Sequence, residues 1–528
     1  MVVRSFTQIN VGTGALGNYT WFFDTPGNVT VFERTFLTAG IVTGVCLAVG
    51  YPYAYMLTVL KPRWRIAAIA VVLVPFWTSL MVRNFAWVVI LQSNHGVLND
   101  ILGGLGLGRL QLLGSISGVI IGMSQILLPF FILPLYATLR GIDRSLLLAA
   151  QSLGARPSAA MRRIYLPLSM PGVVAGCLLV FVLSLGFYIT PAMLGSPQQA
   201  LLSQLIVTQV ETLLDWGTGG AMAVILLVVT FALLGVAWAV SRRGSVTGGT
   251  ARVSGGAHLI APAGRAATIS LRVATTIVAI WLVAPILVVI PTSFEGNTSF
   301  AFPPTALSLR WYSAFFSNPQ WSAALVSSLK IAAIVTVVAT VMGTGAALGL
   351  SRCRRFARAP ITAALLLPMI VPSVIFAVGV YSVFLQWHLI GTTLGFVLAH
   401  TCVALPFVVV TVTASLRGLD RRLEDAAATL GATPLRTFWQ VTAPLIRPGI
   451  VTGALFAFVA SFDELVVALF LVDPTLRTLP VQMYTSVVVQ PDPTVAVAST
   501  LIFMTTLAVL VGALLVSRGR LMRRAYAT

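Results

Sequence analysis

Eleven apolar stretches, each about 20 residues or longer, limit what this chain can fold into. As an α-helix, a stretch of that length crosses about 30 Å of hydrocarbon. Apolar residues make up 58% of the 528 residues and charged residues 9%, whereas soluble proteins carry about a quarter charged residues. The sequence therefore predicts an all-α, polytopic membrane protein. The predicted spans are about 36–60, 66–91, 115–138, 172–194, 220–241, 268–291, 324–350, 361–386, 393–415, 449–472 and 496–517.

A polar segment occurs twice. Residues 138–176 align with residues 415–453 without a gap after a shift of about 277, and roughly half the positions are identical. Such a repeat indicates two related, pseudo-symmetric halves. The predicted domains are an external N-terminal segment 1–35, a first half 36–241 with five spans, a flexible linker 242–267 rich in Gly, Ser, Ala and Arg, and a second half 268–528 with six spans.

Each copy of the repeat predicts a helix, a turn and a second short helix outside the membrane. Asp143 and Asp420 can accept hydrogen bonds from the free amides of a first turn. Gly154 and Gly431 stand where a left-handed residue would end that helix. Prolines are then expected to open the second helix and to stop it before the next apolar stretch, at Pro157, Pro167 and Pro171 and at Pro434, Pro444 and Pro448.

The distribution of charged residues predicts which side of the membrane each connection faces. Membrane proteins collect arginine and lysine on the cytoplasmic side, so the net charge of +19 is assigned to that side rather than to nucleic-acid binding. Basic residues gather in the connections at 61–65, 140–163, 242–272, 352–358, 417–447 and 518–524. Most acids lie in the other connections, at Asp24, Asp100, Glu211, Asp215, Glu295, Asp473 and Asp492. Both copies of the repeat are therefore predicted to be cytoplasmic.

With five spans in the first half, the N-terminus is predicted to be external. Residues 19–35 resemble an external loop that would follow a first helix. Two explanations stay open: this half has lost a helix, or the true start lies upstream of Met1.

The repeated segments resemble the EAA loop of binding-protein-dependent type I ABC importer permeases. That loop reads Glu-Ala-Ala, three residues, Gly, nine residues, Ile-x-Leu-Pro. The resemblance implies cytoplasmic coupling loops at 139–171 and 416–448 that dock on two separate ATPase subunits. The coupling residues it implies are Ala149, Ala150, Gly154 and Pro167, and Asp425, Ala426, Ala427, Gly431 and Pro444. Leu148 replaces the acid in the first copy, and Ala443 replaces the leucine in the second.

The flanking sequence resembles the two spermidine/putrescine permeases joined in one chain. The motifs are Pro75-Phe76-Trp77-Thr78-Ser79, Tyr188-Ile189-Thr190-Pro191, Ser308-Leu309-Arg310-Trp311-Tyr312, Ser461-Phe462-Asp463-Glu464 and Leu479-Pro480-Val481-Gln482. Permeases for ferric iron, thiamine and aminoethylphosphonate share much of this pattern. The resemblance implies a binding-protein partner and a location in the bacterial plasma membrane.

Asp463 and Glu464 are the candidate pathway residues, with Tyr188. A carboxylate at the membrane centre costs about 2.5–3.5 kcal/mol, so it should face a cavity or a partner. The pair could attract a cationic substrate, or it could bond to a neighbouring helix. Gly186 and Phe187 occupy the equivalent positions of the first half.

The sequence favours a transport subunit over an enzyme. Neither of its two lysines, Lys61 and Lys330, stands in GxxxxGK[ST], so ATP and Mg²⁺ are expected only on partner subunits. No catalytic or metal site is expected, because the four cysteines have no ligand-like spacing and His400 is better explained as a structural residue. A secondary transporter driven by an ion gradient is the alternative class.

Overall fold

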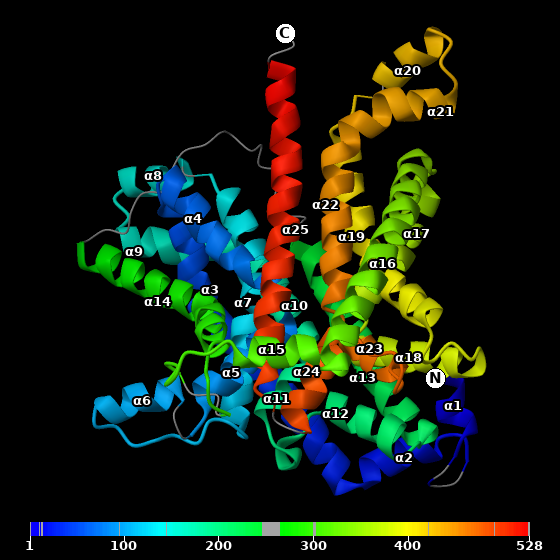
Figure 1. Cartoon of the computed structure of the whole chain (residues 1–528). Coiled ribbons are helices and arrows are strands. Elements are labelled where there is room, and N and C mark those ends of the chain that lie inside the picture. Colours follow the sequence, from blue (N-terminus) through cyan, green and yellow to red (C-terminus); the bar gives the residue numbers. More distant parts are fainter. Residues whose placement is uncertain are drawn as a thin grey trace. The chain divides into compact units, whose positions relative to one another are not determined.

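The computed structural model describes residues 2–9, 11, 14–93, 96–143, 145–244, 265–298, 302–420, 422–489 and 492–525. Helices account for all the regular structure in these ranges (Figure 1), apart from one isolated bridge between Glu295 and Leu307. The chain divides into two compact units, Met1–Ser308 and Leu309–Thr528. The predicted all-α fold is confirmed. Of the predicted linker, residues 245–264 lie outside the described residues.

Unit 1 begins with two short helices and then follows the order of the predicted spans. Its α-helices are α1 (Val2–Thr7), α2 (Gly17–Asp24), α3 (Pro26–Val59), α4 (Pro62–Leu73), α5 (Leu80–Leu91), α6 (Val97–Gly104), α7 (Ile116–Arg140), α8 (Ser145–Ser152), α9 (Pro157–Ala160), α10 (Leu166–Leu185), α11 (Ile189–Leu194), α12 (Leu202–Val207), α13 (Trp216–Gly244) and α14 (Arg265–Thr292). Four shorter helical turns are η1 (Val74–Trp77), η2 (Met161–Tyr165), η3 (Pro197–Gln199) and η4 (Thr208–Thr212).

Unit 2 repeats much of this order. Its helices are α15 (Arg310–Ser317), α16 (Pro319–Arg352), α17 (Arg355–Ile370), α18 (Ser373–Gln386), α19 (Thr393–Arg417), α20 (Arg422–Thr429), α21 (Pro434–Thr437), the turn η5 (Phe438–Thr442), α22 (Ala443–Phe462), α23 (Val466–Leu471), α24 (Leu479–Val488) and α25 (Thr494–Ala525).

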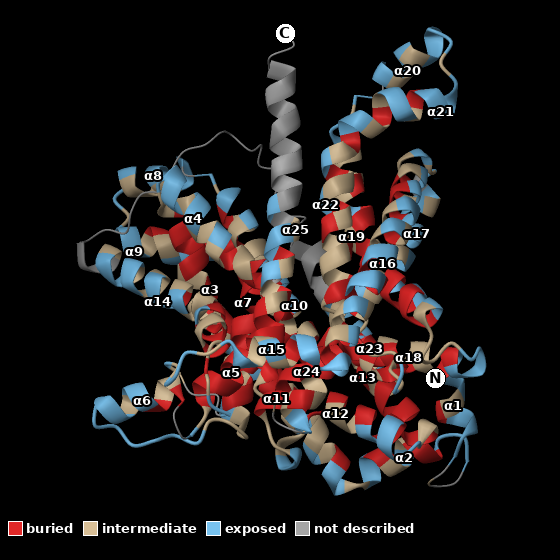
Figure 2. Cartoon of the chain, viewed as in Figure 1, coloured by how far each residue is buried: buried red, intermediate tan, exposed pale blue. Residues whose placement is uncertain are grey.

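All eleven predicted spans fall on helices. Among the described residues, eight helices are long and apolar enough to cross a membrane. The other three predicted spans lie on the bent pair α17–α18 and on the shorter apolar helices at Leu80–Leu91 and Thr494–Val509. The core of each unit lies where these helices meet, and Figure 2 shows buried residues concentrated there in unit 1 along α5 and α7.

Four of the spans predicted as continuous helices are interrupted. The span at 66–91 is divided into α4, η1 and α5, and the span at 361–386 bends by 100° between α17 and α18. The second bend has a local cause: Val371 precedes Pro372 and adopts an extended backbone, with φ −68° and ψ 133°, as residues before proline tend to do. The spans at 172–194 and 449–472 break after α10 and after α22.

The repeat extends through nearly the whole fold. Adding 293 to the bounds of α2 and α3 gives the bounds of α15 and α16. Adding 277 to the bounds of α7 through α11, η2 included, gives the bounds of α19 through α23. The offsets differ by 293 − 277 = 16 residues because unit 1 carries an insertion between α5 and α7, where α6 lies. The match of α2 to α15 makes residues 17–24 the structural equivalent of residues 310–317 in unit 2.

Equivalent hydrogen bonds join equivalent elements in the two units. The Leu202 amide donates to Thr35 Oγ1 at 2.9 Å, and the Leu479 amide donates to Ser328 Oγ at 2.7 Å. These bonds tie the start of α12 to α3 and the start of α24 to α16. A second pair links the Gly114 amide to the Leu194 carbonyl and the Gly391 amide to the Leu471 carbonyl, at 2.8 and 2.9 Å. The two halves therefore share positional detail beyond helix order.

A pair of glycines lets two long helices approach closely in each unit. A Cβ on Gly449 would lie 2.8 Å from the Thr411 carbonyl oxygen, and a Cβ on Gly453 would lie 3.1 Å from the Val408 Cα. Both glycines lie on α22 and face α19. Gly172 and Gly176 repeat the arrangement between α10 and α7. Small residues spaced by four allow membrane helices to pack backbone to backbone.

Helix α14 packs with the helices that precede the linker, although its position in the chain predicted it as the first span of the second half. It contacts α3, α4 and α5. The side chain of Gln125, buried on α7, donates to the Leu282 carbonyl of α14 at 3.0 Å. The boundary between the compact units consequently lies after Ser308 and not in the linker.

Candidate functional site

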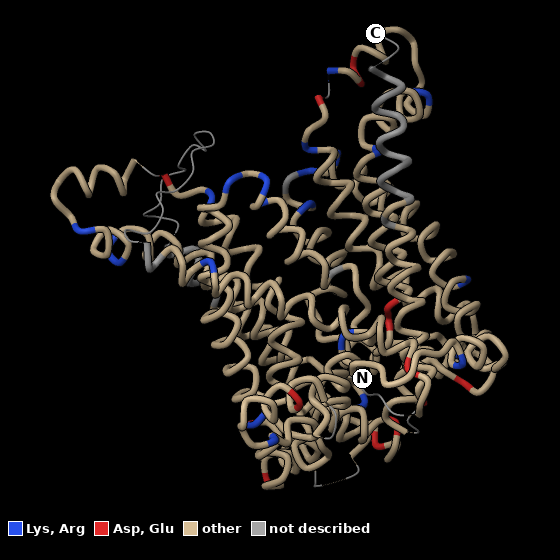
Figure 3. The backbone as a smooth tube through the Cα atoms, turned by 60° about the vertical axis from the view of Figure 1, so that its left-hand side comes forward, with Lys and Arg blue, Asp and Glu red and all other residues tan. Residues whose placement is uncertain are grey.

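The two repeated segments form bent elbows at one end of each unit. Helices α8 and α9 lie beyond α7 and α10, and helices α20 and α21 lie beyond α19 and α22 (Figure 1). Figure 3 shows lysine and arginine gathered at this end of each unit. Unit 1 has most of its acids at the opposite end, whereas the elbow of unit 2 carries acidic as well as basic residues. The elbows therefore lie at the end that the charge distribution predicts to be cytoplasmic.

The predicted turn chemistry of the elbows is confirmed. The Asp143 and Asp420 side chains accept hydrogen bonds from the amides of Ser145 and Arg422, at 2.9 and 3.0 Å. Gly154 and Gly431 have φ of +85° and +81°. This left-handed backbone is readily available to glycine because glycine has no Cβ. Each elbow therefore turns where the sequence predicts.

The prediction that prolines stop the second short helix is wrong. The helix continues from Pro157 to Leu185 and from Pro434 to Phe462. In both units a π-helical turn, η2 or η5, immediately precedes the proline pair. A proline ring clashes with the carbonyl four residues earlier in an α-helix. For Pro167 and Pro444 that carbonyl lies in the π turn, whose wider spacing accommodates the ring without ending the helix.

Most of the predicted coupling residues are accessible. Ala149, Gly154 and Pro167 are exposed in unit 1, and Ala150 is half-buried. In unit 2 the exposed residues are Asp425, Ala426, Gly431 and Pro444, and Ala427 is half-buried. The two elbows thus share a pattern of exposure at equivalent positions, although Leu148 stands in unit 1 where unit 2 has Asp425.

Two exposed leucines were missed by the sequence prediction. Leu153 is 89% exposed and Leu430 is 88% exposed. They are equivalent by the 277-residue offset, and each immediately precedes the left-handed glycine. A large apolar side chain fully exposed at the same place in both halves is suited to a partner surface. The signal available in the sequence was an apolar residue kept at the turn of a polar repeat.

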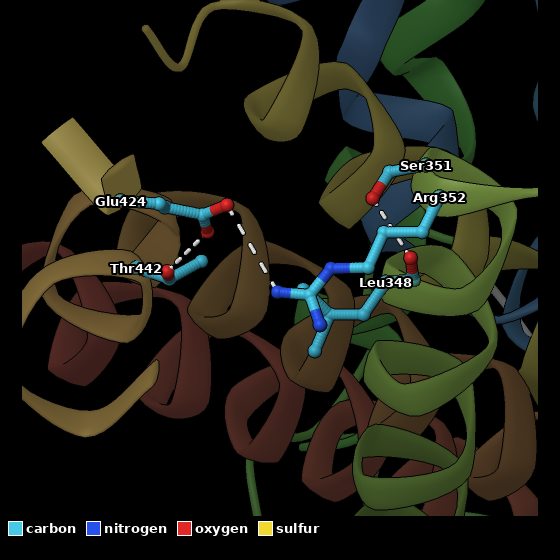
Figure 4. A network of polar contacts seen from close by, with 5 residues as sticks. All are labelled: Leu348, Ser351, Arg352, Glu424 and Thr442. Carbon is cyan, nitrogen blue, oxygen red and sulfur yellow. Dashed lines mark hydrogen bonds and ion pairs between the residues drawn. The ribbon is translucent and has the colours of Figure 1, made fainter. Parts of the chain in front are cut away.

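Glu424 fixes the elbow of unit 2 to the rest of its unit. Its carboxylate accepts a hydrogen bond from the Thr442 hydroxyl of η5, and its other oxygen lies 3.9 Å from the guanidinium of Arg352, the last residue of α16 (Figure 4). Asp425, the predicted motif acid, is exposed and points to no hydrogen-bond partner among the described residues. The neighbouring acids therefore have separable roles.

Unit 1 has an apolar and an aromatic residue at the positions that carry this hydrogen bond in unit 2. Leu147 replaces Glu424, and Tyr165 replaces Thr442, by the same offset. Tyr165 is buried and packs edge-on against Tyr55 of α3, with ring centroids 5.5 Å apart. The two elbows share a backbone path but differ in the chemistry that anchors them.

We predict that Glu424→Ala loosens α20, whereas Asp425→Ala does not. A hydrogen bond to a charged group contributes about 1.5–3 kcal/mol, while the Arg352 contact adds at most about 1 kcal/mol because that side chain is largely exposed. Amide hydrogen exchange in residues 422–429 should accelerate roughly ten-fold or more. Equal exchange rates in the two variants would contradict this assignment.

Asp463 and Glu464 lie together at the break between α22 and α23. Both are half-buried. Glu464 Oε1 accepts a hydrogen bond from the Val467 amide at 2.9 Å, which caps the first turn of α23. The break does not depend on the acids, because unit 1 breaks at the same register with Gly186 and Phe187. Glu464 thus has a structural contact, and the carboxyl groups of Glu464 and Asp463 lie together beside an interrupted helix.

His400 anchors the helix that carries these acids. It is 1% exposed on α19, and its Nδ1 lies 3.1 Å from both the carbonyl and the hydroxyl oxygen of Ser461. The hydrogen bond expected of this histidine is confirmed. Tyr188, the third predicted pathway residue, is the N-cap residue of α11 and lies at the corresponding break of unit 1.

The family assignment comes from a match to both halves. The model of the family described as "Binding-protein-dependent transport system inner membrane component" matches residues 40–241 and 339–521. The chain belongs to this family. It is an ABC importer permease of the inner membrane, and the elbows lie within the two matched regions.

Curated relatives of the permease include polyamine transport proteins. The spermidine/putrescine transport system permease protein PotB of Escherichia coli is 36% identical over 229 residues, which span 43% of this chain and 82% of PotB. The putrescine transport system permease protein PotI of the same organism is 35% identical over 229 residues, spanning 42% of this chain and 81% of PotI. The predicted resemblance to these permeases is confirmed.

Among solved structures, the permease matches a bacterial alginate ABC transporter in complex with an alginate pentasaccharide-bound periplasmic protein. The match has 21% sequence identity and a TM-score of 0.39, and it covers 47% of this chain and 88% of the other.

Proposed function

We propose that this chain supplies both halves of the permease of an ATP-driven polyamine importer. The observation that carries the proposal is the 36% and 35% identity to permeases of spermidine/putrescine and putrescine transport systems, each spanning about four fifths of the relative. The two halves in one polypeptide would replace the two permease subunits of such a system.

In this proposal two ATPase subunits dock on the two elbows. Leu153 and Leu430 enter apolar grooves of the ATPases, and the short helices α8 and α20 transmit their movement to α10 and α22 through the continuous helices that follow. ATP binding draws the elbows together and opens the pathway outward, where an external binding protein delivers substrate. Hydrolysis returns the pathway to its inward-facing state.

The acids at the break in unit 2 support a cationic substrate. A negatively charged pair beside an interrupted membrane helix attracts a polyamine, because the cost of holding carboxylates there falls when a cation approaches. Unit 1 has Gly186 and Phe187 at the equivalent positions, so it contributes no carboxylate at its own break.

The test is ATP-dependent uptake by the complex that co-purifies with this chain from its native membrane, reconstituted with its binding protein. Wild type should take up radiolabelled spermidine or putrescine. The Asp463→Asn/Glu464→Gln variant should lower the maximal uptake rate roughly ten-fold, which corresponds to about 1.4 kcal/mol at the transport barrier. Asp24→Asn is the matched control, because this acid is exposed, belongs to unit 1 and is distant in the sequence from Asp463 and Glu464.

Three results would contradict the proposal. Uptake of ferric iron, thiamine or aminoethylphosphonate without polyamine uptake would replace the substrate. Transport that continues without ATP and collapses with an ion gradient would indicate a secondary transporter. Unchanged polyamine kinetics in the double variant would leave Asp463 and Glu464 with a structural role alone.

A further inference from the structure

A cavity of about 720 Å³ lies in unit 1 between α14 and the corner joining α3 to α4. Its volume is within the range of small-molecule sites, about 300–1,000 Å³. Three cationic side chains line it: Lys61 and Arg63 from the corner, and Arg272 from α14. None of the residues that line it is acidic.

The three cations are available to a ligand. All are exposed, and the ion pair found among the described residues lies elsewhere, between Arg352 and Glu424. Arg63 lies over the Trp64 ring, 5.8 Å from its centroid, and its side chain remains exposed. Positive charge is therefore concentrated in the cavity without a described carboxylate to balance it.

The rest of the cavity wall is mainly apolar. It includes Met56, Val59, Ala67, Val71 and Leu271. The indole of Trp64, which also lines the cavity, is 55% exposed. Tryptophan is enriched where a membrane meets water, and basic residues gather at the cytoplasmic surface. A site that combines exposed cations with an apolar wall along two membrane helices suits an amphiphile with a negatively charged head.

We propose that this cavity binds an anionic phospholipid, with its phosphate held by Lys61, Arg63 and Arg272 and its acyl chain along α3 and α14. Basic pockets between membrane helices on the cytoplasmic side accommodate such headgroups. Because α14 faces α3 and α4 across this cavity, the bound lipid would also strengthen the packing of α14 against these two helices. The proposal does not depend on the transported substrate.

The test is native mass spectrometry of the full chain released from bilayers containing equal amounts of phosphatidylglycerol and phosphatidylcholine. The wild-type chain should retain more phosphatidylglycerol than phosphatidylcholine. The Lys61→Gln/Arg63→Gln/Arg272→Gln variant should lose that preference by roughly five-fold per cation, on the order of 100-fold in total. Arg272→Lys alone should keep most of it, because the charge is retained.

The matched control is Arg354→Gln/Arg358→Gln/Arg417→Gln, which removes three exposed cations from unit 2 and none from the cavity. It should retain phosphatidylglycerol as wild type does. Equal retention of both lipids by wild type, or equal loss in the cavity variant and the control, would overturn the proposal. So would displacement of the lipid by millimolar inorganic phosphate, which would indicate a site for a free anion.

Discussion

The Leu153→Glu/Leu430→Glu double variant is expected to lose ATPase binding and substrate uptake. Each leucine is almost fully exposed in the chain alone, and burying a leucine against a partner contributes about 1.5–3 kcal/mol. Each ATPase subunit loses one such contact to a charge that resists burial, so its binding should weaken roughly 10- to 100-fold. Co-purification of the ATPase with tagged chain measures binding directly, and uptake measures its consequence.

Leu105→Glu/Leu107→Glu is the control for this experiment. These leucines are 70% and 56% exposed near the end of α6, in a segment predicted to be external. The control should bind ATPase and transport substrate at wild-type levels. If the Leu153/Leu430 variant inserts normally and still retains its ATPases, the elbows are not the docking surfaces, and the proposed energy coupling is wrong.

The Gly449→Val/Gly453→Val double variant is expected to destabilise unit 2. The new Cβ atoms would lie 2.8 Å from the Thr411 carbonyl and 3.1 Å from the Val408 Cα, so α22 would have to move away from α19. Overpacking of this kind costs about 1–3 kcal/mol per site. The thermal unfolding midpoint of the purified chain should fall by roughly 5–10 °C.

Gly345→Val is the matched control for the glycine pair. Gly345 lies within α16, and a Cβ there would meet nothing within 4 Å. It should therefore shift the midpoint little, although it carries the same intrinsic change of residue type. A drop as large as that of the double variant would mean that helix propensity, not close packing, explains the effect.

The sequence predicted the positions of the helices and elbows better than the breaks within the membrane spans. Apolar length is enough to locate a span, and Asp143 and Gly154 act through neighbours a few residues away. Breaks such as the one after Phe462 are invisible to hydropathy, because both sides of the break are apolar. The error at Pro167 arose because proline alone predicts a helix end, whereas a preceding π turn accommodates it.

The candidate site was predictable only where the repeat pointed to it. The motif directed attention to Asp425, while the hydrogen bond to Thr442 and the contact with Arg352 belong to the adjacent Glu424. Arg352 is 72 residues from Glu424 in the sequence, so no local pattern could pair them. The packing of α14 was missed for the same reason, since chain order does not specify which helices become neighbours.

That packing has a consequence for how such a protein is made. Helix α14 follows the segment 245–264 in the chain, yet its buried partners, including Gln125, precede that segment. Cutting the polypeptide there would produce two products, one carrying a helix and the other the surface that receives it. Synthesis as a single translation product delivers both in equal number and already tethered, so neither has to find its counterpart by diffusion in the bilayer.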